Sequence, residues 1–318
     1  MPIANKLNFA GGKCNEPGRL DRKLVIVTGA NTGIGKETAA ELARRGANVI
    51  MACRNTERAE EARREILSIY GEGQPTSLKT NIVNEKIKEF ITPVKPDQLI
   101  IEELNLGSFK SVRVFVERIH QKEMKIDILI NNAGIYCCPY GKTEDGFESQ
   151  IGINHLGHFL LTELLIPEMN SASRIIILSS RAHLYSKMSL IPLNVEEKDY
   201  SRFQCYYRSK LANAMYAQYL SKKLANKGIL TASVHPGVVR TEISRNDRFS
   251  SVVFFGLGRP FTKNPWQGAQ TTLYCALTPE LISGAYYADC AVAKPNPLVL
   301  DEEAQKELIS ASLEAVGL

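Results

Sequence analysis

Long hydrophobic runs are scarce in this 318-residue chain, and their scarcity argues against a membrane-spanning protein. Residues 1–20, an expected N-terminal extension, contain no apolar stretch suited to a signal peptide or a membrane span. The longest apolar stretch, residues 250–261, is interrupted by Gly256, Gly258 and Pro260 and is too short to cross a bilayer. We therefore expect a cytoplasmic protein, and peripheral contact with a membrane stays open.

The cysteines lack the number and spacing of a disulfide framework or a zinc site. There are seven of them, and no Cys-x-x-Cys pair occurs. A reducing compartment is the natural interpretation, and no metal is predicted. A block of Lys and Arg with interleaved aromatics is also missing, although the net charge is +5, so nucleic-acid binding is not expected.

Short apolar runs alternate with amphipathic segments along the chain. Continuous apolar runs are typical of buried parallel strands, and the segments between them have helical periodicity. The alternation predicts an α/β fold with a single domain, a doubly wound Rossmann parallel sheet of about seven strands flanked by helices. The expected strands are residues 24–27, 48–53, 99–106, 126–130, 174–178, 229–234 and 285–288, and the expected helices include 56–70, 149–169, 203–226, 266–276 and 301–315.

One segment interrupts this alternation. Residues 71–98 are long for a connection between a helix and a strand, and they contain Pro75, Pro93 and Pro96. We interpret the segment as a surface insertion without a functional role, with a short helix near residues 85–90. Because no linker or repeat divides the rest, the domain is expected to span residues 21–318.

A glycine-rich turn directly follows the first expected strand. Residues 28–35 read Thr-Gly-Ala-Asn-Thr-Gly-Ile-Gly. Gly29 permits a tight turn, Gly33 lets the backbone approach a pyrophosphate, and Gly35 lets helix and strand pack closely. The pyrophosphate would meet free N–H groups at the helix N-terminus. The turn therefore predicts a dinucleotide site formed by Gly29, Asn31, Thr32, Gly33, Ile34 and Gly35.

The end of the second expected strand indicates which dinucleotide binds. NAD sites usually carry a carboxylate there for the ribose 2′-hydroxyl. This chain has Ala52-Cys53-Arg54-Asn55 instead, and Arg54 can offer a planar fork of donors to a 2′-phosphate. Lys36 could add positive charge. We therefore expect NADP(H), with a solvated arginine at a strand end as the plainer alternative.

Tyr206 and Lys210 are four residues apart on an expected helix, one above the other on the same face. An ammonium beside a phenol stabilises the phenolate, and moving the pKa from about 10 to near 7 needs roughly 4 kcal/mol. Lys210 and an oxidised nicotinamide ring together could supply this. Tyr207 is the rival acid/base, but its partner four residues on is Leu211, so Tyr206 is preferred.

Ser180 ends the fifth expected strand, at the edge where doubly wound sheets place their sites. Its hydroxyl is suited to polarise a substrate carbonyl. Chemistry alone does not exclude the neighbouring Ser179.

Taken in order, these motifs make the chain similar to the short-chain dehydrogenase/reductase family. The likeness covers nearly the whole chain after Leu20, apart from the insertion. Finer details in residues 28–38, 52–54, 154–159, 209–213 and 235–240 resemble the retinol dehydrogenase branch. The motifs that carry the family resemblance are Thr28–Gly35, Asn131-Asn132-Ala133-Gly134, Asn154, Ser179-Ser180, Tyr206-x3-Lys210 and Pro236-Gly237.

The resemblance implies a catalytic tetrad of Asn154, Ser180, Tyr206 and Lys210, in which Asn154 would hold a water that connects Lys210 to solvent. It also implies NADP(H) as the cofactor and lipophilic alcohols and aldehydes as substrates. The chain departs from the branch in lacking an N-terminal anchor and in carrying Asn105 where an aspartate commonly contacts the adenine. The further residues implied for the cofactor are Leu106, Asn132, Ala133, Gly134, Pro236, Gly237, Val239 and Thr241, beside Tyr206 and Lys210.

Two weaker signals have plain explanations. His155 and His158 are three residues apart, but no third ligand follows, so packing is expected rather than metal binding. Cys137-Cys138, after the fourth strand, could line a substrate cleft and is interpreted as small apolar filler.

Substrate contacts are harder to assign. His183, three residues past Ser180, is a candidate beside Ser180 and Tyr206. Residues 238–265 stand where the family has its substrate lid, and they carry five aromatic or branched side chains between residues 249 and 255. Such side chains suit a lipophilic substrate, ordinary packing or shallow insertion into a membrane surface.

We therefore expect an NADP(H)-dependent oxidoreductase that interconverts a lipophilic, retinol-like alcohol and its aldehyde or ketone by hydride transfer. Ser180 and Tyr206 would bind the carbonyl oxygen, and Tyr206 would donate the proton. The rival hypotheses are a steroid or other carbonyl reductase on the same scaffold and a catalytically silent NADPH-binding sensor. The expected partner is a small molecule, and a homo-oligomer stays open.

Overall fold

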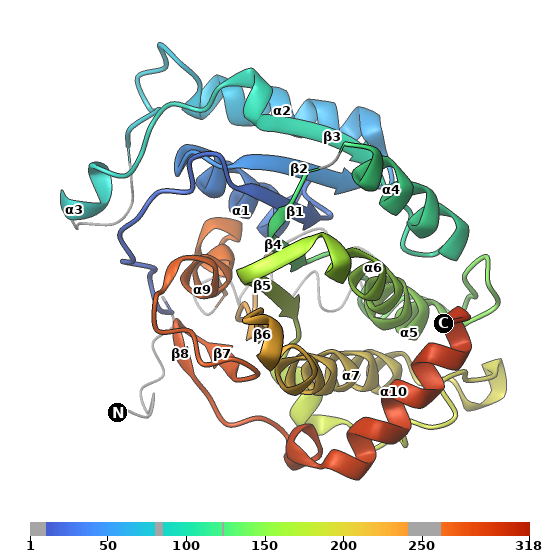
Figure 1. Ribbon diagram of the computed structural model, residues 1–318. Coiled ribbons are helices and arrows are strands. Elements are labelled where there is room, and N and C mark those ends of the chain that lie inside the picture. The colour runs from blue at the N-terminus through green and yellow to red at the C-terminus, as the bar shows by residue number, and fades with distance from the viewer. Residues whose placement is uncertain (1–10, 80–84, 123, 241–261) are drawn as a thin grey trace.

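The computed structural model describes residues 11–79, 85–122, 124–240 and 262–318, which form one sheet with helices on both faces (Figure 1). The strands follow the order β3-β2-β1-β4-β5-β6-β7-β8. All neighbouring strands are parallel except β7 and β8, which pair antiparallel. The strands are β1 (Leu24–Thr28), β2 (Asn48–Cys53), β3 (Leu99–Glu103), β4 (Ile126–Asn131), β5 (Met169–Leu178), β6 (Leu230–His235), β7 (Tyr286–Ala288) and β8 (Ala291–Val292).

The helices cover the sheet in two layers, each with its own hydrophobic cluster. Side chains from α1, α2 and α9 fill one cluster, and those from α4, α6, α7 and α10 fill the other. The helices are α1 (Gly33–Arg44), α2 (Thr56–Tyr70), α3 (Glu85–Lys88), α4 (Phe109–Gln121), α5 (Ser149–Ile151), α6 (Gly157–Leu165), α7 (Arg202–Lys223), α9 (Pro265–Leu277) and α10 (Glu302–Val316). The predicted doubly wound α/β fold is confirmed, with a two-residue antiparallel strand added at the edge.

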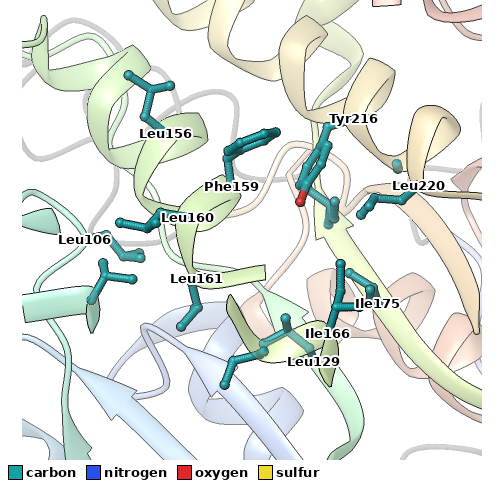
Figure 2. Packing of buried hydrophobic residues seen from close by; sticks show 14 of the residues in the cluster. Leu106, Leu129, Leu156, Phe159, Leu160, Leu161, Ile166, Ile175, Tyr216 and Leu220 are labelled. Carbon is teal, nitrogen blue, oxygen red and sulfur yellow. The ribbon is translucent and has the colours of Figure 1, made fainter. Parts of the chain in front are cut away.

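The larger cluster shows how helices pack on the sheet (Figure 2). Phe159 on α6 and Tyr216 on α7 are buried with their ring centroids 4.7 Å apart. The Tyr216 hydroxyl donates to Glu163 Oε1 at 3.0 Å, so this ring keeps its polar end satisfied. Burying one such ring contributes roughly 1.5–3 kcal/mol to stability. The contact therefore helps to fix α7, the helix that carries Tyr206.

The expected helix at residues 149–169 is broken into several pieces. A π-helical turn, Gly152–Leu156, separates α5 from α6, and a 3-10 turn at Ile166–Glu168 ends the helical segment. Pro167 lacks the N–H that a longer helix would need. The next strand, β5, begins at Met169 rather than at Arg174, because Met169 pairs with Ile126 across an irregularity in the register. Periodicity alone did not reveal this bulge.

Residues 71–98 are tied to the domain at both ends. Gly71 and Val94 form a parallel bridge, and the buried guanidinium of Arg44 donates to the carbonyl of Ser77. Ile87 and Ile91 are buried against Trp266. The expected short helix occurs as α3, so the described part of the segment packs on α1 and α9 rather than lying free on the surface.

None of the described helices combines the length and the hydropathy that crossing a membrane requires. The sheet itself positions the site. Strand order reverses between β1 and β4, and such a switch point opens a crevice at the carboxyl ends of the two strands.

Candidate active site

A cavity of about 290 Å³ lies at the switch point. Its walls come from the ends of β1, β2, β4 and β5, from the loop after β3, and from α7. The lining residues are Gly29, Asn31, Thr32, Gly33, Ile34, Gly35, Ala52, Arg54, Asn55, Arg58, Leu104, Asn105, Leu106, Gly107, Asn132, Ala133, Gly134, Ile135, Tyr136, Ile153, Leu178, Ser179, Tyr206, Lys210 and Pro236.

The glycine-rich turn forms one wall of the cavity. Gly29 and Gly33 have φ values of +66° and +54°, a region that favours glycine. A Cβ on Gly35 would lie 2.3 Å from the carbonyl oxygen of Gly29, so only glycine permits this approach. The Thr32 side chain makes no capping bond, and the first turn of α1 carries no acidic residue. The N-terminus of α1 therefore presents unpaired N–H groups to an anion.

Thr28 links the glycine turn to the end of β4. Its Oγ1 accepts from the backbone N–H groups of Asn132 and Ala133, both at 2.9 Å, and Asn132 Nδ2 donates to the Thr28 carbonyl at 2.7 Å. His158 Nε2 lies 2.8 Å from Thr28 Oγ1, and His158 Nδ1 lies 3.1 Å from the carbonyl of Asn154. This network holds the cavity floor between two strands and the π-turn.

Burial keeps the two histidines of the π-turn region neutral. It lowers the pKa of His158 to about 3 and that of His155 to about 4. His155 lies between Asn213 Oδ1 and Ser312 Oγ. Within the described residues, no group of His, Cys, Asp or Glu side chains is arranged to hold a metal. Both histidine rings are buried and contact neighbouring protein groups, as the packing interpretation expects.

Two guanidinium groups reach the cavity at the end of β2. Arg54 is exposed at the strand end, and Arg58 stands on the first turn of α2, one helical turn further on. The N-cap Asn55 accepts from the Arg58 backbone N–H at 2.7 Å, which fixes the start of this helix. Among the described lining residues, none is Asp or Glu. Lys36 forms an ion pair with Glu65, and it does not line the cavity.

Asn105 stands beside the cavity with much of its amide already engaged. Its Oδ1 accepts from the Gly107 backbone N–H at 3.0 Å, and its Nδ2 donates to Glu144 Oε1 at 3.2 Å. One Nδ2 hydrogen and one Oδ1 lone pair remain for another partner. Leu106 and Gly107 continue this wall.

Tyr206, Lys210 and Ser180 meet at the carboxyl end of β5. Lys210 Nζ donates to the carbonyl of Leu178 at 3.1 Å and lies 5.7 Å from the centroid of the Tyr206 ring. The Ser180 hydroxyl lies close enough to the Tyr206 phenol to lower its pKa, and its Oγ also accepts from the Ala182 backbone N–H at 3.2 Å. Ser179 Oγ instead donates to the Lys210 carbonyl at 2.7 Å. Of the two serines, only Ser180 therefore presents its hydroxyl to Tyr206.

Burial dominates the electrostatics of this group. It raises the pKa of the Tyr206 phenol above its ordinary value, and the hydrogen bond from Ser180 opposes the rise. It lowers the pKa of Lys210 to about 8. The expected lowering of the Tyr206 pKa is not found in the protein by itself, because desolvation of the buried phenolate is the largest influence on that pKa.

Asn154 lies in the π-helical turn and supports the cavity wall through hydrogen bonds to Ile135 and Ser209. Its Oδ1 accepts from the Ile135 N–H at 2.8 Å, and its Nδ2 donates to the Ile135 carbonyl and to Ser209 Oγ, both at 3.0 Å. A Cβ on Gly134 would lie 3.1 Å from Asn154 Oδ1 and 3.4 Å from Lys210 Nζ. The structure therefore brings all four expected tetrad residues together, with the Asn154 amide committed to its protein neighbours.

Comparison with known proteins agrees with this geometry. The family model described as short chain dehydrogenase matches residues 23–94 and 76–250. The chain belongs to the short-chain dehydrogenase family. Retinol dehydrogenase 12 of Mus musculus is 41% identical over 314 residues, covering 98% of this chain and 91% of the relative. Retinol dehydrogenase 14 of Homo sapiens is 40% identical over 310 residues, covering 95% and 89%. The protein is an oxidoreductase of the alcohol dehydrogenase type.

Solved structures share the short-chain dehydrogenase fold. An uncharacterized protein from Mycobacterium Paratuberculosis aligns with a TM-score of 0.73 at 30% identity, covering 96% of this chain and 98% of that one. A short chain dehydrogenase from Burkholderia cenocepacia J2315, solved in complex with NADP, aligns with a TM-score of 0.62 at 22% identity, covering 85% and 96%.

Several residues predicted for the short-chain dehydrogenase site lie outside the cavity lining, among them Asn154 and Ser180. His183 is fully buried: its Nε2 accepts from the Asn296 N–H at 3.0 Å, and its Nδ1 lies 2.5 Å from the Ser180 carbonyl. Both ring nitrogens are therefore engaged by backbone groups, and the contact of His183 with substrate stays a prediction. Gly237 and Val239 lie behind Pro236, close to Lys263 and Gly268. Thr241 and residues 241–261 of the expected lid fall outside the described residues.

The two neighbouring cysteines lie outside the cavity, and several residues that line it carry no sequence motif. Cys137 and Cys138 are buried, and neither lines the cavity, as expected for filler. Arg58 was missed, although its place one turn after Arg54 is a usable signal. The lining also includes Ile135, Tyr136 and Ile153, which no motif indicated.

Proposed function

We propose that this short-chain dehydrogenase uses NADP(H) to interconvert a lipophilic alcohol and its aldehyde or ketone, with Tyr206 as the acid/base. The observation that carries the proposal is the cavity itself. It joins Tyr206 and Lys210 to a wall with Arg54, Arg58 and, among its described residues, no carboxylate, and Ser180 lies next to Tyr206. Such a wall favours a phosphorylated dinucleotide over an unphosphorylated one.

The residues present fit such a cofactor. The close approach of Gly35 to the Gly29 carbonyl brings the N-terminus of α1 to the cavity wall, where its unpaired N–H groups would bind the pyrophosphate. Arg54 and Arg58 would hold the 2′-phosphate, and Asn105 and Leu106 would border the adenine. When bound, the nicotinamide would supply or accept a hydride. The residues proposed for its half of the cofactor are Asn132, Ala133, Gly134, Tyr206, Lys210, Pro236, Gly237, Val239 and Thr241.

The proton chemistry belongs to the chain's own groups. In reduction, Ser180 and Tyr206 would donate hydrogen bonds to the substrate oxygen, and the Tyr206 Oη–H would pass its proton to the developing alkoxide. Lys210 would stabilise the phenolate left behind. Asn154 would hold the π-turn against Ile135 and Ser209, and through them the position of α7.

The substrate class is inferred from the relatives. Retinol dehydrogenases 12 and 14 are named for a lipophilic alcohol and are about 40% identical over most of the chain. We propose a retinol-like substrate, and a single catalytic domain over residues 21–318 with residues 238–265 beside the substrate.

A panel of alcohols and carbonyls, run with NADP(H) and NAD(H), tests the proposal. The expected result is turnover of lipophilic aldehydes with NADPH, at least tenfold more efficient than with NADH. Ketosteroids reduced faster than retinaldehyde would favour the steroid reductase instead. NADPH binding without turnover of any compound would favour the sensor.

A further inference from the structure

The backbone of Ser180 is held by His183, three residues further along the chain. Ser180 is the N-cap of the 3-10 turn Arg181–Tyr185, and its carbonyl oxygen lies 2.5 Å from His183 Nδ1. The same oxygen accepts from the His183 backbone N–H at 3.0 Å. One residue therefore contacts this carbonyl through both its backbone and its side chain, at the carboxyl end of β5.

The second partner of the His183 ring decides which nitrogen carries the hydrogen. His183 is buried, and burial lowers its pKa, so the ring is neutral and has a single N–H. The Asn296 backbone N–H donates to Nε2 at 3.0 Å, so Nε2 is the unprotonated nitrogen. The hydrogen therefore sits on Nδ1, which donates it to the Ser180 carbonyl.

Asn296 and Tyr286 fix the ring from segments far along the chain. Asn296 Nδ2 donates to the His183 carbonyl at 3.2 Å. Its Oδ1 accepts from the Leu298 N–H at 3.0 Å, at the start of the 3-10 turn Pro297–Leu300. Tyr286 on β7 packs on the ring, with centroids 4.7 Å apart and an interplanar angle of 65°. His183 is therefore held by β7 and by the segment before α10, in addition to its own turn.

The position of the Ser180 backbone determines where its hydroxyl can donate. Ser180 Oγ accepts from the Ala182 N–H at 3.2 Å, so the hydroxyl hydrogen remains for another acceptor. The Tyr206 phenol is close enough for this hydroxyl to lower its pKa. A shift of the Ser180 peptide would move Oγ relative to Tyr206, and a misplacement of about 1 Å can cost roughly 100-fold in rate.

We propose that His183 is a positioning residue for catalysis, whose Nδ1–H holds the Ser180 carbonyl and so keeps the Ser180 hydroxyl directed at the substrate oxygen. This inference rests on the proposed function, in which Ser180 and Tyr206 both donate to that oxygen. His183 is not among the described residues that line the cavity, so it acts through Ser180. The bond from Asn296 to Nε2 sets the tautomer that this role requires.

Two amide substitutions separate the roles of the two ring nitrogens. An Asn amide places its nitrogen near the position of Nδ1 and can still donate to the Ser180 carbonyl. The longer Gln amide reaches the position of Nε2 and can accept from the Asn296 N–H. The measured quantities are kcat and KM for reduction of retinaldehyde with NADPH. We expect His183→Gln to lower kcat roughly ten- to hundredfold with KM changed less than about threefold, and His183→Asn to restore most of the loss.

A double-mutant cycle distinguishes positioning from a general loss of structure. Ser180→Ala removes the hydroxyl that His183 directs, so His183→Gln should cause no further loss of kcat in that background. Denaturant titration of each variant gives its free energy of unfolding and shows that it is folded. Equal kcat values of His183→Asn and His183→Gln would overturn the inference. An equal loss from His183→Gln with and without the Ser180 hydroxyl would also overturn it.

A measurement that needs no turnover separates this inference from the proposed function. Nitrogen NMR of the histidine side chains at neutral pH distinguishes the two neutral tautomers, and the signal missing from His183→Asn belongs to His183. We expect the Nδ1–H tautomer. A wild type that reduces no carbonyl refutes the proposed function, and the catalytic role of His183 fails with it. Normal turnover together with an Nε2–H or a protonated ring refutes the positioning role alone.

Discussion

Lys210 Nζ lies 5.7 Å from the centroid of the Tyr206 ring and donates a hydrogen bond to the Leu178 carbonyl rather than to the phenol. The lysine is therefore held by the end of β5, in a position from which its charge acts on Tyr206 through space. Because Lys210 is 3% exposed, that charge is poorly screened by solvent.

Removal of the lysine charge should shift the pH dependence of catalysis. In alcohol oxidation Tyr206 must be deprotonated, and the ammonium of Lys210 favours the phenolate. We expect Lys210→Met to move the rising limb of the kcat/KM–pH profile upward by at least about one pH unit, or about 1.4 kcal/mol. Profiles of both proteins with NADP⁺ check this, and an unshifted limb would show that Lys210 does not tune the phenol.

Arg54 should discriminate between the two nicotinamide cofactors. A charge-assisted hydrogen bond to a 2′-phosphate is worth about 1.5–3 kcal/mol, so Arg54→Ala should weaken NADPH binding about tenfold or more and leave NADH binding nearly unchanged. Lys36→Ala is the control, since that ammonium pairs with Glu65 and lies outside the cavity lining. Fluorescence titrations measure both affinities, and equal losses for the two cofactors would refute the assignment.

Gly35→Ala should lower the affinity for NADPH and the affinity for NADH by the same factor. A Cβ at this position would lie 2.3 Å from the Gly29 carbonyl and 2.5 Å from Asn132 Nδ2, so Gly35→Ala must push the turn away from the floor. We expect NADPH and NADH affinities to fall together by more than tenfold, as cofactor titrations of the variant would show. Gly141→Ala is a milder control, because its Cβ would meet only Ser149 Oγ at 3.3 Å. Wild-type affinity of Gly35→Ala for both cofactors would show that cofactor binding does not depend on the close contact between Gly35 and the Gly29 carbonyl.

The buried histidines should make stability depend on pH. Burial lowers the pKa of His158 to about 3 and of His155 to about 4, whereas the unfolded value is about 6.5. The unfolded state therefore binds more protons below about pH 6.5, and the free energy of unfolding should fall as the pH falls toward 4. The slope should approach about 1.4 kcal/mol per pH unit for each histidine.

Denaturant titrations at pH 7.5 and 5.0 measure this effect. His158→Gln should reduce the difference between the two pH values. His120→Gln is the control, since that side chain is 43% exposed. If the unfolding free energy of His158→Gln still falls by the same amount between pH 7.5 and 5.0, groups other than His158 cause the loss of stability in acid.

Local sequence patterns were enough to predict the parallel strands of the sheet, the glycine-rich turn and the Tyr206–Lys210 pair. Each of these depends on residues close together in the chain or on strand ends that a doubly wound sheet must bring together. The same reasoning placed Arg54 at the cavity, because its strand end lies beside the glycine turn.

Features that depend on distant partners could not be predicted in this way. The π-turn at Asn154 is stabilised by Ile135 and Ser209, and His183 is buried by Asn296, 113 residues further on. The rings of Tyr136, Phe203, Tyr207 and Tyr185 come together only after folding. The pKa of Tyr206 also escaped prediction, because helical spacing shows the neighbouring charge and not the degree of burial.

The proposed function depends most directly on proton transfer by the Tyr206 phenol. The most direct test is kcat/KM for NADPH-dependent reduction of a lipophilic aldehyde by Tyr206→Phe, with the NADPH dissociation constant measured on the same protein. Tyr207→Phe is the matched control, since it removes the neighbouring hydroxyl and keeps the ring. We predict that Tyr206→Phe loses about 10²–10⁴-fold in kcat/KM with NADPH affinity intact, while Tyr207→Phe keeps its activity. Wild-type turnover by Tyr206→Phe would show that another group transfers the proton.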